Sequence, residues 1–176
     1  MCEEALGVVS LFDAGRLGGG EVYSPNARLR VMAIASCGGH WVQLRKLSRA
    51  FDGHDVSYVT VSRDYRVEVD GARFYSVIDA NLTDKFALVL LAAQMVFVVL
   101  RERPDVVIST GAAPGFFGLA WSKLLLGSRT IWVDSIANSE RLSASGRHVG
   151  RFADLWLTQW KHLRSNEGPY YEGAIL

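Results

Sequence analysis

Residues 30–41 read Arg-Val-Met-Ala-Ile-Ala-Ser-Cys-Gly-Gly-His-Trp, and this stretch decides the fold. Its first half is an apolar run of strand length, and its second half opens a segment with helical periodicity. A strand that turns through two glycines into a helix is typical of the first unit of a parallel α/β sheet. We therefore predict a strand over 30–35, a tight turn, and a helix over 40–51.

The same alternation of short β-branched runs and longer helical stretches continues to the end of the chain. This order indicates an α/β fold with a Rossmann-like parallel sheet, in which ligands lie at the carboxyl ends of the strands. Residues 1–29 include three consecutive glycines and no clean period, so we expect a mobile leader before one domain over 30–176. The other strands are predicted at 56–61, 73–77, 105–109, 130–133 and 155–158, and the other helices at 83–103, 114–126 and 142–152.

Composition narrows the classes of function. The chain has 176 residues, with 19 Lys and Arg against 18 Asp and Glu, and 49% of its residues are hydrophobic. One domain of this size can build a core, and the balanced charge disfavours a protein that coats nucleic acid. Two cysteines, Cys2 and Cys37, do not make a disulfide framework, and the N-terminal residues do not read as a secretory signal. We expect a reducing, cytosolic compartment.

One predicted helix carries much of the high mean hydropathy of +0.14. Within residues 86–100, Gln94 is the only polar residue. A helix of that length reaches about 22 Å, short of the roughly 30 Å hydrocarbon core of a bilayer, so it should not span a membrane. Two interpretations stay open: the helix packs on all sides within the protein, or one face, with Phe86, Leu90 and Phe97, touches a membrane or a partner.

The first loop at the expected ligand edge is 36–41. Its glycines, Gly38 and Gly39, allow a phosphate or a sugar to approach a helix start, although an ordinary tight turn has the same pattern. His40 can take a proton from a sugar hydroxyl, or it can simply cap the turn. Cys37 is expected to be a small packing residue. Neither the dinucleotide fingerprint nor the P-loop is present.

Two further loops follow predicted strands. The loop 109–116 joins small residues to a proline near a helix start, which fits a second phosphate or sugar cradle or a plain connection. In the loop 134–146, Asp134 can bind a sugar hydroxyl, assist a proton relay or cap a helix, and Ser135 can also cap. The four histidines lack the spacing of metal ligands, so no metal site is expected.

Charge is uneven along the chain. Residues 28–49 contain five Lys and Arg and no acid, and residues 141–165 contain five against one Asp. Such segments suit an anionic surface or a pyrophosphate, and they equally suit a solvated helix face. No recognised nucleic-acid-binding module accompanies them, so nucleic acid is not expected as a partner.

Several motifs, in order, resemble one family. They are Ser-Cys-Gly-Gly-His-Trp at 36–41, Pro-Asp-Val-Val at 104–107 before the Gly111 loop, Asp134-Ser135 leading to Leu-Ser-Ala-Ser-Gly at 142–146, Ala153-Asp154, and Thr158-Gln159-Trp160. The chain resembles, from residue 30 to about 176, the acceptor-side subunit of split UDP-sugar glycosyltransferases. That family includes the membrane-recruiting subunit of the dolichol-linked N-acetylglucosaminyltransferase and bacterial polysaccharide-biosynthesis proteins.

The resemblance implies a GT-B glycosyltransferase cut into two polypeptides, of which this chain would be the N-terminal half. It would bind a polyprenyl-diphosphate-linked glycan as a peripheral subunit at the cytoplasmic face of the membrane. A partner, the C-terminal half, would bind the UDP-sugar, so this chain would hold no cofactor of its own. The pair would be an inverting glycosyltransferase of polysaccharide biosynthesis.

The resemblance also implies roles for residues. His40 would be the catalytic base, and Asp134 matches the acidic position of the family. The C-terminal tail, with Tyr171, Ile175 and Leu176, would dock the partner. The residues that would bind the acceptor and its phosphates are Ser36, Gly38, Gly39, Gly111, Gly115, Ser135 and Asn138, although Asn138 stands where eukaryotic relatives often have Arg.

Two other functions stay open at this point. The chain could be a non-catalytic scaffold that recruits the true enzyme to the membrane and enhances it. It could also be an unrelated nucleotide-binding Rossmann enzyme that acts alone.

Overall fold

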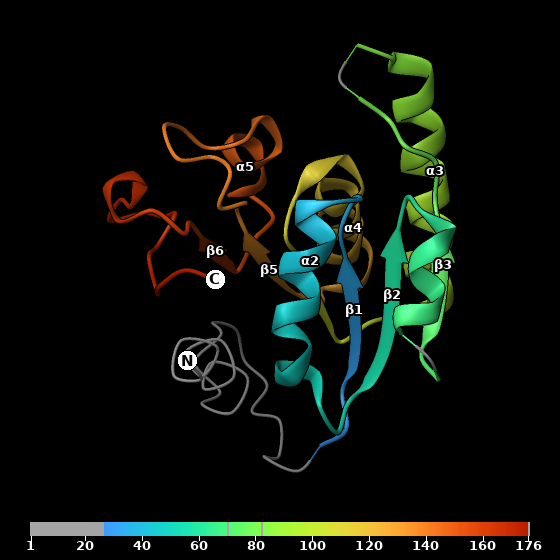
Figure 1. Ribbon diagram of the computed structural model, residues 1–176. Coiled ribbons are helices and arrows are strands. Elements are labelled where there is room, and N and C mark those ends of the chain that lie inside the picture. Colours follow the sequence, from blue (N-terminus) through green and yellow to red (C-terminus); the bar gives the residue numbers. More distant parts are fainter. Residues whose placement is uncertain (1–26, 70, 82, 176) are drawn as a thin grey trace.

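Six parallel strands form one sheet in this computed structural model, which describes residues 27–69, 71–81 and 83–175 (Figure 1). The strands lie side by side in the order β3-β2-β1-β4-β5-β6. Every predicted strand is present, with ends that agree to within one residue. The bounds are β1 Arg30–Ile34, β2 Asp55–Thr60, β3 Arg73–Ser76, β4 Val106–Ser109, β5 Arg129–Val133 and β6 Leu155–Leu157. The predicted leader lies outside the described residues as far as residue 26.

The predicted helices are also present, but the one predicted at 83–103 is slightly shorter than expected and two others are markedly shorter. The predicted helix 40–51 tightens into a 3-10 helix at Leu47, and the one predicted at 142–152 starts only after Ser143, whose side chain caps it. Two 3-10 helices, η2 and η3, were not predicted. The bounds are α2 Gly39–Lys46, η1 Leu47–Phe51, η2 Arg63–Glu68, α3 Lys85–Glu102, α4 Ala112–Leu126, α5 Ala144–Val149 and η3 Lys161–Leu163.

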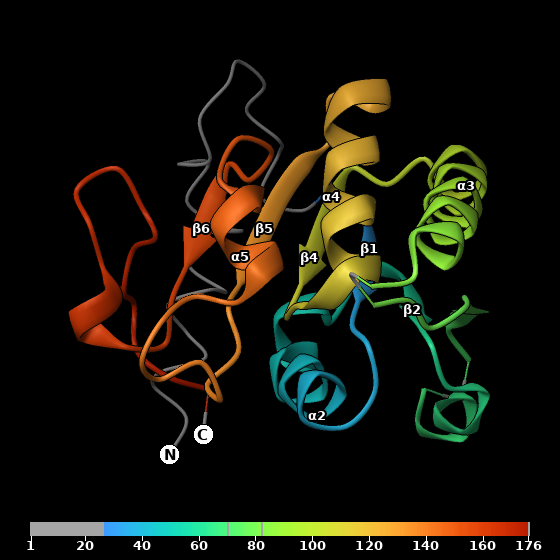
Figure 2. The same ribbon diagram turned by 90° about the horizontal axis from the view of Figure 1, so that it is seen from above.

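Helices cover both faces of the sheet, with α2 on one side and α3, α4 and α5 on the other (Figure 2). Because successive side chains of a strand point to opposite faces, β1 contributes to two cores. Val31 and Ala33 lie in the core beneath α2, whereas Met32 and Ile34 lie in the core beneath α3 and α4. Burial on both faces explains why the central strands are apolar throughout rather than alternating.

The strand order places the expected ligand site at the carboxyl ends of the two central strands, β1 and β4. Strand β1 pairs with β2 on one side and with β4 on the other, so the chain turns in opposite directions after β1 and after β4. Ligands bind open α/β sheets at such a switch point, outside the carboxyl ends of the strands. The loops 35–38 and 110–111 therefore lie together at this edge.

Candidate functional site

His40 lies at the switch point, at the second residue of α2, and is held by the loop after β4. Its Nδ1 lies 2.7 Å from the carbonyl oxygen of Thr110, and the Thr110 hydroxyl donates to the carbonyl of His40 at 2.7 Å. A carbonyl only accepts hydrogen bonds, so Nδ1 must carry the proton in this contact. The lone pair of the neutral imidazole is then on Nε2, where it can accept a proton.

Gly111 allows this contact because it has no side chain. A Cβ atom there would lie 2.5 Å from Cε1 of His40, and the φ of Gly111 is +136°, a value that other residues rarely adopt. The next residue, Ala112, has φ +66°, which is also unusual for a residue with a side chain. The loop after β4 is thus shaped to bring its backbone against the imidazole, so two sequence-predicted loops form one site.

The two helices that begin at the switch point, α2 and α4, lack side-chain caps. The residues before α2 and α4 are Gly38 and Gly111, and no side chain at the cap accepts a hydrogen bond from the N–H groups of either helix start. By contrast, the Asp84 carboxylate caps α3 and the Ser143 hydroxyl caps α5. Uncapped helix starts present backbone N–H groups and the positive end of the helix dipole, which favour an anion such as a phosphate.

A segment that the sequence analysis missed borders the first glycine turn. The 3-10 helix η2 carries Tyr65, whose hydroxyl accepts the N–H of Gly38 at 3.0 Å. The ring of Tyr65 stacks on Trp41, with centroids 4.7 Å apart, and the indole N–H of Trp41 donates to Glu68 at 2.8 Å. Ser62 caps this turn by accepting from the N–H of Asp64. A Ser two residues before an Asp is a short-range sequence signal for such a turn.

Asp134, for which a catalytic role was predicted, is enclosed in the structure. Its side chain is 1% exposed, and its carboxylate accepts from the backbone N–H of Ser143, from the Ser143 hydroxyl and from the Asn138 amide. A Cβ at Gly146 would lie 2.9 Å from its Oδ2, so the glycine leaves room for this carboxylate. Asp134 and Asn138 therefore close the loop 134–146 rather than open onto the switch point.

The other sequence-predicted site residues divide into open and buried positions. Gly38 and Gly39 are exposed at the start of α2, with open space where a Cβ would point. Gly115 is buried, and a Cβ there would collide with the Ser109 hydroxyl, so its role is close packing of α4 on β4. Ser36 is half-buried. The expectation that Cys37 packs inside is wrong, because its thiol is exposed.

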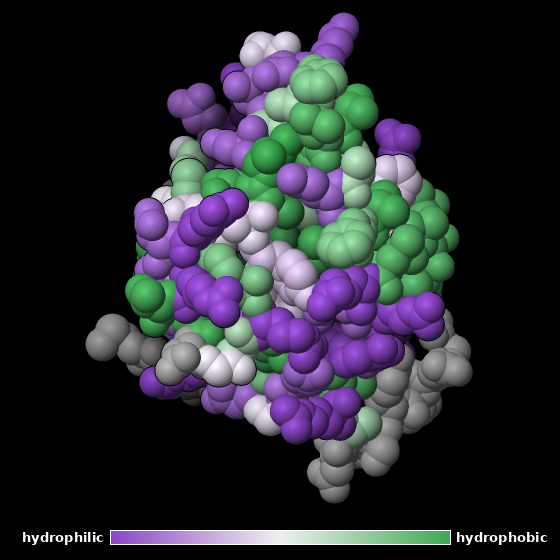
Figure 3. Space-filling view, turned by 90° about the vertical axis from the view of Figure 1, so that its right-hand side faces the viewer, coloured by the Kyte–Doolittle hydropathy of each residue, from purple (hydrophilic) through white to green (hydrophobic). Residues whose placement is uncertain are grey.

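The apolar helix α3 has two unlike faces. Leu91, Met95 and Val99 are buried against the sheet, whereas Phe86 is 74% exposed, Phe97 62% and Leu90 43%. The interpretation that this helix packs on all sides is therefore wrong, and the outer face is free within the described part of the chain. Figure 3 shows apolar side chains gathered in the upper and right-hand part of this side of the molecule, above charged ones. Across the described ranges, no helix combines the length and hydropathy needed to cross a bilayer.

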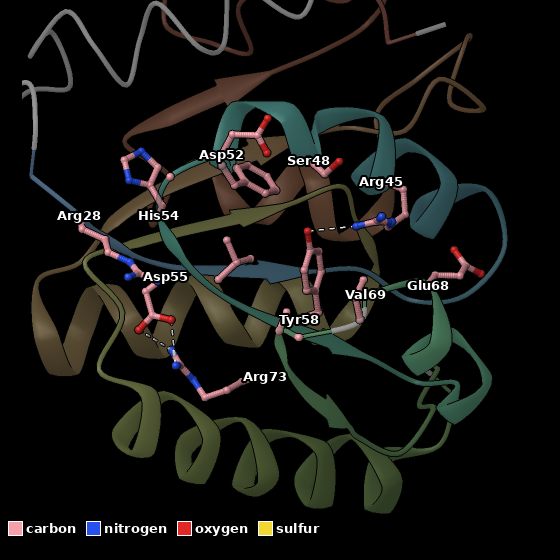
Figure 4. Close-up of a pocket in the computed structure, with 15 residues that line it drawn as sticks. Arg28, Arg45, Ser48, Asp52, His54, Asp55, Tyr58, Glu68, Val69 and Arg73 are labelled. Atoms are coloured by element: carbon pink, nitrogen blue, oxygen red, sulfur yellow. Dashed lines mark hydrogen bonds and ion pairs between the residues drawn. The ribbon is translucent and has the colours of Figure 1, made fainter.

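A separate hollow lies toward the amino end of β2, away from the switch point. It has a volume of about 430 Å³, and Figure 4 shows Arg45 of α2 and Tyr58 of β2 pointing toward each other in it. Arg45 donates to the Tyr58 hydroxyl at 3.1 Å, and burial raises the pKa of this phenol although Arg45 acts in the opposite direction. Within the basic segment 28–49, Arg30 pairs with Asp105, and Arg45 contacts Tyr58.

The C-terminal tail returns to the core beneath α2. Ile175 is half-buried and packs against that core, and Tyr171 is half-buried as well. Leu176, the third predicted docking residue, lies outside the described residues. Among residues 27–69, 71–81 and 83–175 no group of three or more His, Cys, Asp or Glu is placed to hold a metal ion.

Comparison with known proteins gives consistent results. A family model described as "Oligosaccharide biosynthesis protein Alg14 like" matches residues 54–175. The UDP-N-acetylglucosamine transferase subunit ALG14 of Eremothecium gossypii is 27% identical over 180 residues, which cover 85% of this chain and 79% of that protein. These matches confirm the resemblance read from the motifs.

Solved structures confirm the fold. The crystal structure of MurG from Acinetobacter baumannii has a TM-score of 0.67 at 14% identity and covers 81% of this chain and 45% of MurG. A UDP-N-acetylglucosamine 2-epimerase from Rickettsia bellii has a TM-score of 0.57 at 18% identity and covers 77% of this chain and 40% of the epimerase. The chain spans less than half the length of these proteins, and its Rossmann-like sheet is equivalent to one part of a GT-B fold.

Proposed function

The chain belongs to the Alg14-like family of oligosaccharide biosynthesis proteins, and from this we propose that it is the acceptor-binding subunit of a two-component inverting glycosyltransferase. The acceptor would be a glycan linked to a polyprenyl diphosphate. A second subunit, corresponding to the C-terminal half of a GT-B enzyme, would bind the UDP-sugar. The family match, together with a fold that spans under half of MurG, supports the division of labour between two chains.

His40 is the proposed base. As the acceptor hydroxyl oxygen forms its bond to the anomeric carbon of the sugar, Nε2 takes the hydroxyl proton, and the bond from that carbon to UDP breaks with its electron pair leaving on UDP. The imidazolium that forms keeps its Nδ1–H directed at the Thr110 carbonyl, 2.7 Å away. The dipole of the Thr110 carbonyl orients the imidazole ring and stabilises its positive charge. Direct displacement inverts the configuration at the anomeric carbon.

The two uncapped helix starts are the proposed diphosphate site. The backbone at Gly38 and Gly39 is exposed. The start of α4 lies beside it, since Thr110, just before Gly111, is hydrogen-bonded to His40 of α2. Two helix starts that converge on one point supply several N–H donors and two positive dipole ends without needing a metal ligand. A diphosphate bound there places the first sugar of the acceptor next to the base.

The outer face of α3 is the proposed membrane contact. Helix α3 begins after the carboxyl end of β3, so its start, with the exposed Phe86, lies toward the same edge of the sheet as His40 (Figure 1). An apolar helix face resting in the headgroup region would hold the diphosphate site close to the lipid from which the acceptor extends. This arrangement supports the proposal that the chain is a peripheral protein at the cytoplasmic face of the membrane.

The observation that carries the proposal is the contact of His40 with Thr110 between two uncapped helix starts. The test is transfer from UDP-N-acetylglucosamine, or from other UDP-sugars, to a synthetic polyprenyl-diphosphate-linked sugar by the chain co-purified with its UDP-sugar-binding subunit. We expect transfer by the pair and none by either chain alone. Full activity of the isolated chain would favour a stand-alone nucleotide-binding enzyme. Activity of the second subunit without this chain, merely enhanced by it, would favour a recruiting scaffold.

A further inference from the structure

Two buried glutamines join the tail of the chain to the helix that carries His40. Gln43 and Gln159 are 5% and 4% exposed, and the Nε2 of Gln159 donates to the Oε1 of Gln43 at 2.6 Å. Gln159 belongs to the Thr158-Gln159-Trp160 motif, for which neither catalysis nor phosphate binding gives a reason. Buried amides are costly unless all their polar atoms are paired, so this contact requires an explanation.

Backbone groups fix the orientation of both amides. The Oε1 of Gln159 accepts the N–H of Ile175 at 2.8 Å, and its Nε2 also donates to the carbonyl of Asp134 at 2.9 Å. Since a backbone N–H only donates and a carbonyl only accepts, the Gln159 amide has a single possible assignment of its oxygen and nitrogen atoms. Gln43 must then turn its oxygen to Gln159, and the same oxygen accepts the N–H of Ile136 at 3.3 Å.

The pair therefore ties three segments together. Gln43 lies in α2, three residues after His40, and its Nε2 donates to the Ser135 hydroxyl at 3.1 Å. Gln159 reaches the loop after β5 and the tail at Ile175. Trp160 strengthens the same junction, because its indole N–H donates to the carbonyl of Ile136 at 2.8 Å. A shift of the tail must therefore change the contacts of Gln159. A shift of Gln159 must in turn change the contacts of α2, the helix that carries His40.

We infer that Gln159 is a positioning residue that couples the C-terminal tail, through Gln43, to the His40 helix. Residues 171–175 form no helix or strand, so they can change their contacts at lower cost than the core can. The inference rests on the proposed function in that a partner subunit would be what engages the tail. Coupling between two sites is reciprocal, so the helix of the base must also influence binding at the tail.

The first test uses the free chain and needs no partner. Ile175→Pro removes the N–H that Gln159 accepts, whereas Ile175→Val keeps it. Hydrogen exchange at the amide of Ile136, which donates to Gln43, is expected to accelerate about tenfold in Ile175→Pro and in Gln159→Leu, but to stay within twofold in Ile175→Val. Unchanged exchange at Ile136 in Ile175→Pro, with the mutant folded by circular dichroism, would overturn the coupling.

The second test uses the co-purified pair. Gln43→Leu breaks the bond to Gln159 rather than a bond to the tail, so reciprocity predicts about tenfold weaker binding of the partner, with a similar loss for Gln159→Leu and little further loss in the double mutant. At saturating partner, kcat for the two single variants should fall by about tenfold. Thr130→Val, which removes another buried hydroxyl that donates to the Phe152 carbonyl, is the matched control and should leave both quantities within twofold.

The outcomes separate the two proposals. If Gln43→Leu and Gln159→Leu lower only the melting temperature, as Thr130→Val does, Gln159 is a structural residue and the inference fails. If the wild-type pair transfers no sugar, the proposed function fails, whereas the exchange experiment on the free chain still decides whether the tail and α2 are coupled.

Discussion

Two kinds of helix start occur in this molecule, and they differ in what they leave free. Helices α3 and α5 begin under the side chains of Asp84 and Ser143, which satisfy backbone N–H groups at each start. Helices α2 and α4 begin after glycines and have no such cap. The backbone N–H groups at these two starts are left without a side-chain acceptor, and this supports the proposal that they bind an anionic ligand beside His40.

The largest expected effect on activity comes from removing the proposed base, which lies between the two uncapped helix starts. His40→Ala should lower kcat of the co-purified pair by about 10²–10⁴-fold, a range typical for loss of a general base. The binding of the partner and the melting temperature should change little, because the imidazole is only half-buried. Steady-state kinetics at saturating acceptor measure the effect, and wild-type turnover in a fully assembled His40→Ala pair would show that this chain does not supply the base.

Gly111→Ala should have the next largest effect. The new methyl group would press on the imidazole, and a φ of +136° strains any residue with a side chain, so we expect a fall in kcat on the order of 10²-fold from a misplaced base. Gly127→Ala is the matched control, since Gly127 ends α4 at φ +66° with open space around its Cβ position. Gly127→Ala should lose about 1–2 kcal/mol of folding free energy and Gly111→Ala at least as much, but only Gly111→Ala should lose activity. Equal kinetics for the two would contradict the proposed contact.

Gly39→Ala separates function from stability at an uncapped start. Gly39 is the first residue of α2 and a Cβ there meets open space, so alanine should stabilise the fold by about 0.4–1 kcal/mol, because it reduces the conformational freedom of the unfolded chain. The same methyl group would stand where the diphosphate is proposed to approach. We expect KM for the lipid-linked acceptor to rise about threefold to tenfold, with KM for the UDP-sugar unchanged. A stabilised variant with an unaltered acceptor KM would argue against a ligand at α2.

Asp84→Ala should have the smallest effect on activity. The carboxylate of Asp84 accepts the N–H of Ala87 at 2.9 Å, and loss of such a cap costs about 1 kcal/mol. Urea unfolding should register that loss, while kcat and the acceptor KM stay within twofold of wild type. An activity loss as large as that of Gly39→Ala would mean that the capped and uncapped starts do not differ in function.

Most of the fold could be predicted because its signals are local. Strand β1 and the glycine turn after it are adjacent in sequence, and the central strands are apolar enough to indicate burial on both faces. The same holds for α3, whose apolar run is continuous, although which face packs could not be predicted since it depends on where β1 and α4 lie. The missed helix η2 is short and begins at Ser62 with a side-chain turn that resembles any loop.

The site was predicted less completely because its contacts are long-range. The two glycine loops were identified one by one, but the hydrogen bond of His40 to Thr110 spans 70 residues and has no trace in either loop alone. Asp134 is enclosed because Ser143, nine residues further on, folds back and donates to its carboxylate. The sequence shows only an acidic residue after a strand, which is also the pattern of a residue open to a ligand. Likewise, Gly115 reads as part of a cradle, yet what it permits is contact of α4 with Ser109.

The comparison of helix starts is tested most directly by the backbone amide resonances of the free chain titrated with geranyl diphosphate. We predict saturable shifts at the amides of Gly39 and His40 in α2 and of Ala113 in α4, with the amides of Phe86 and Ser145, near the capped starts, unmoved. Inorganic sulfate at the same concentration, as a control for bare charge, should cause smaller shifts at the same amides. Shifts that are equal at all four helix starts, or that spare α2 and α4, would contradict the account.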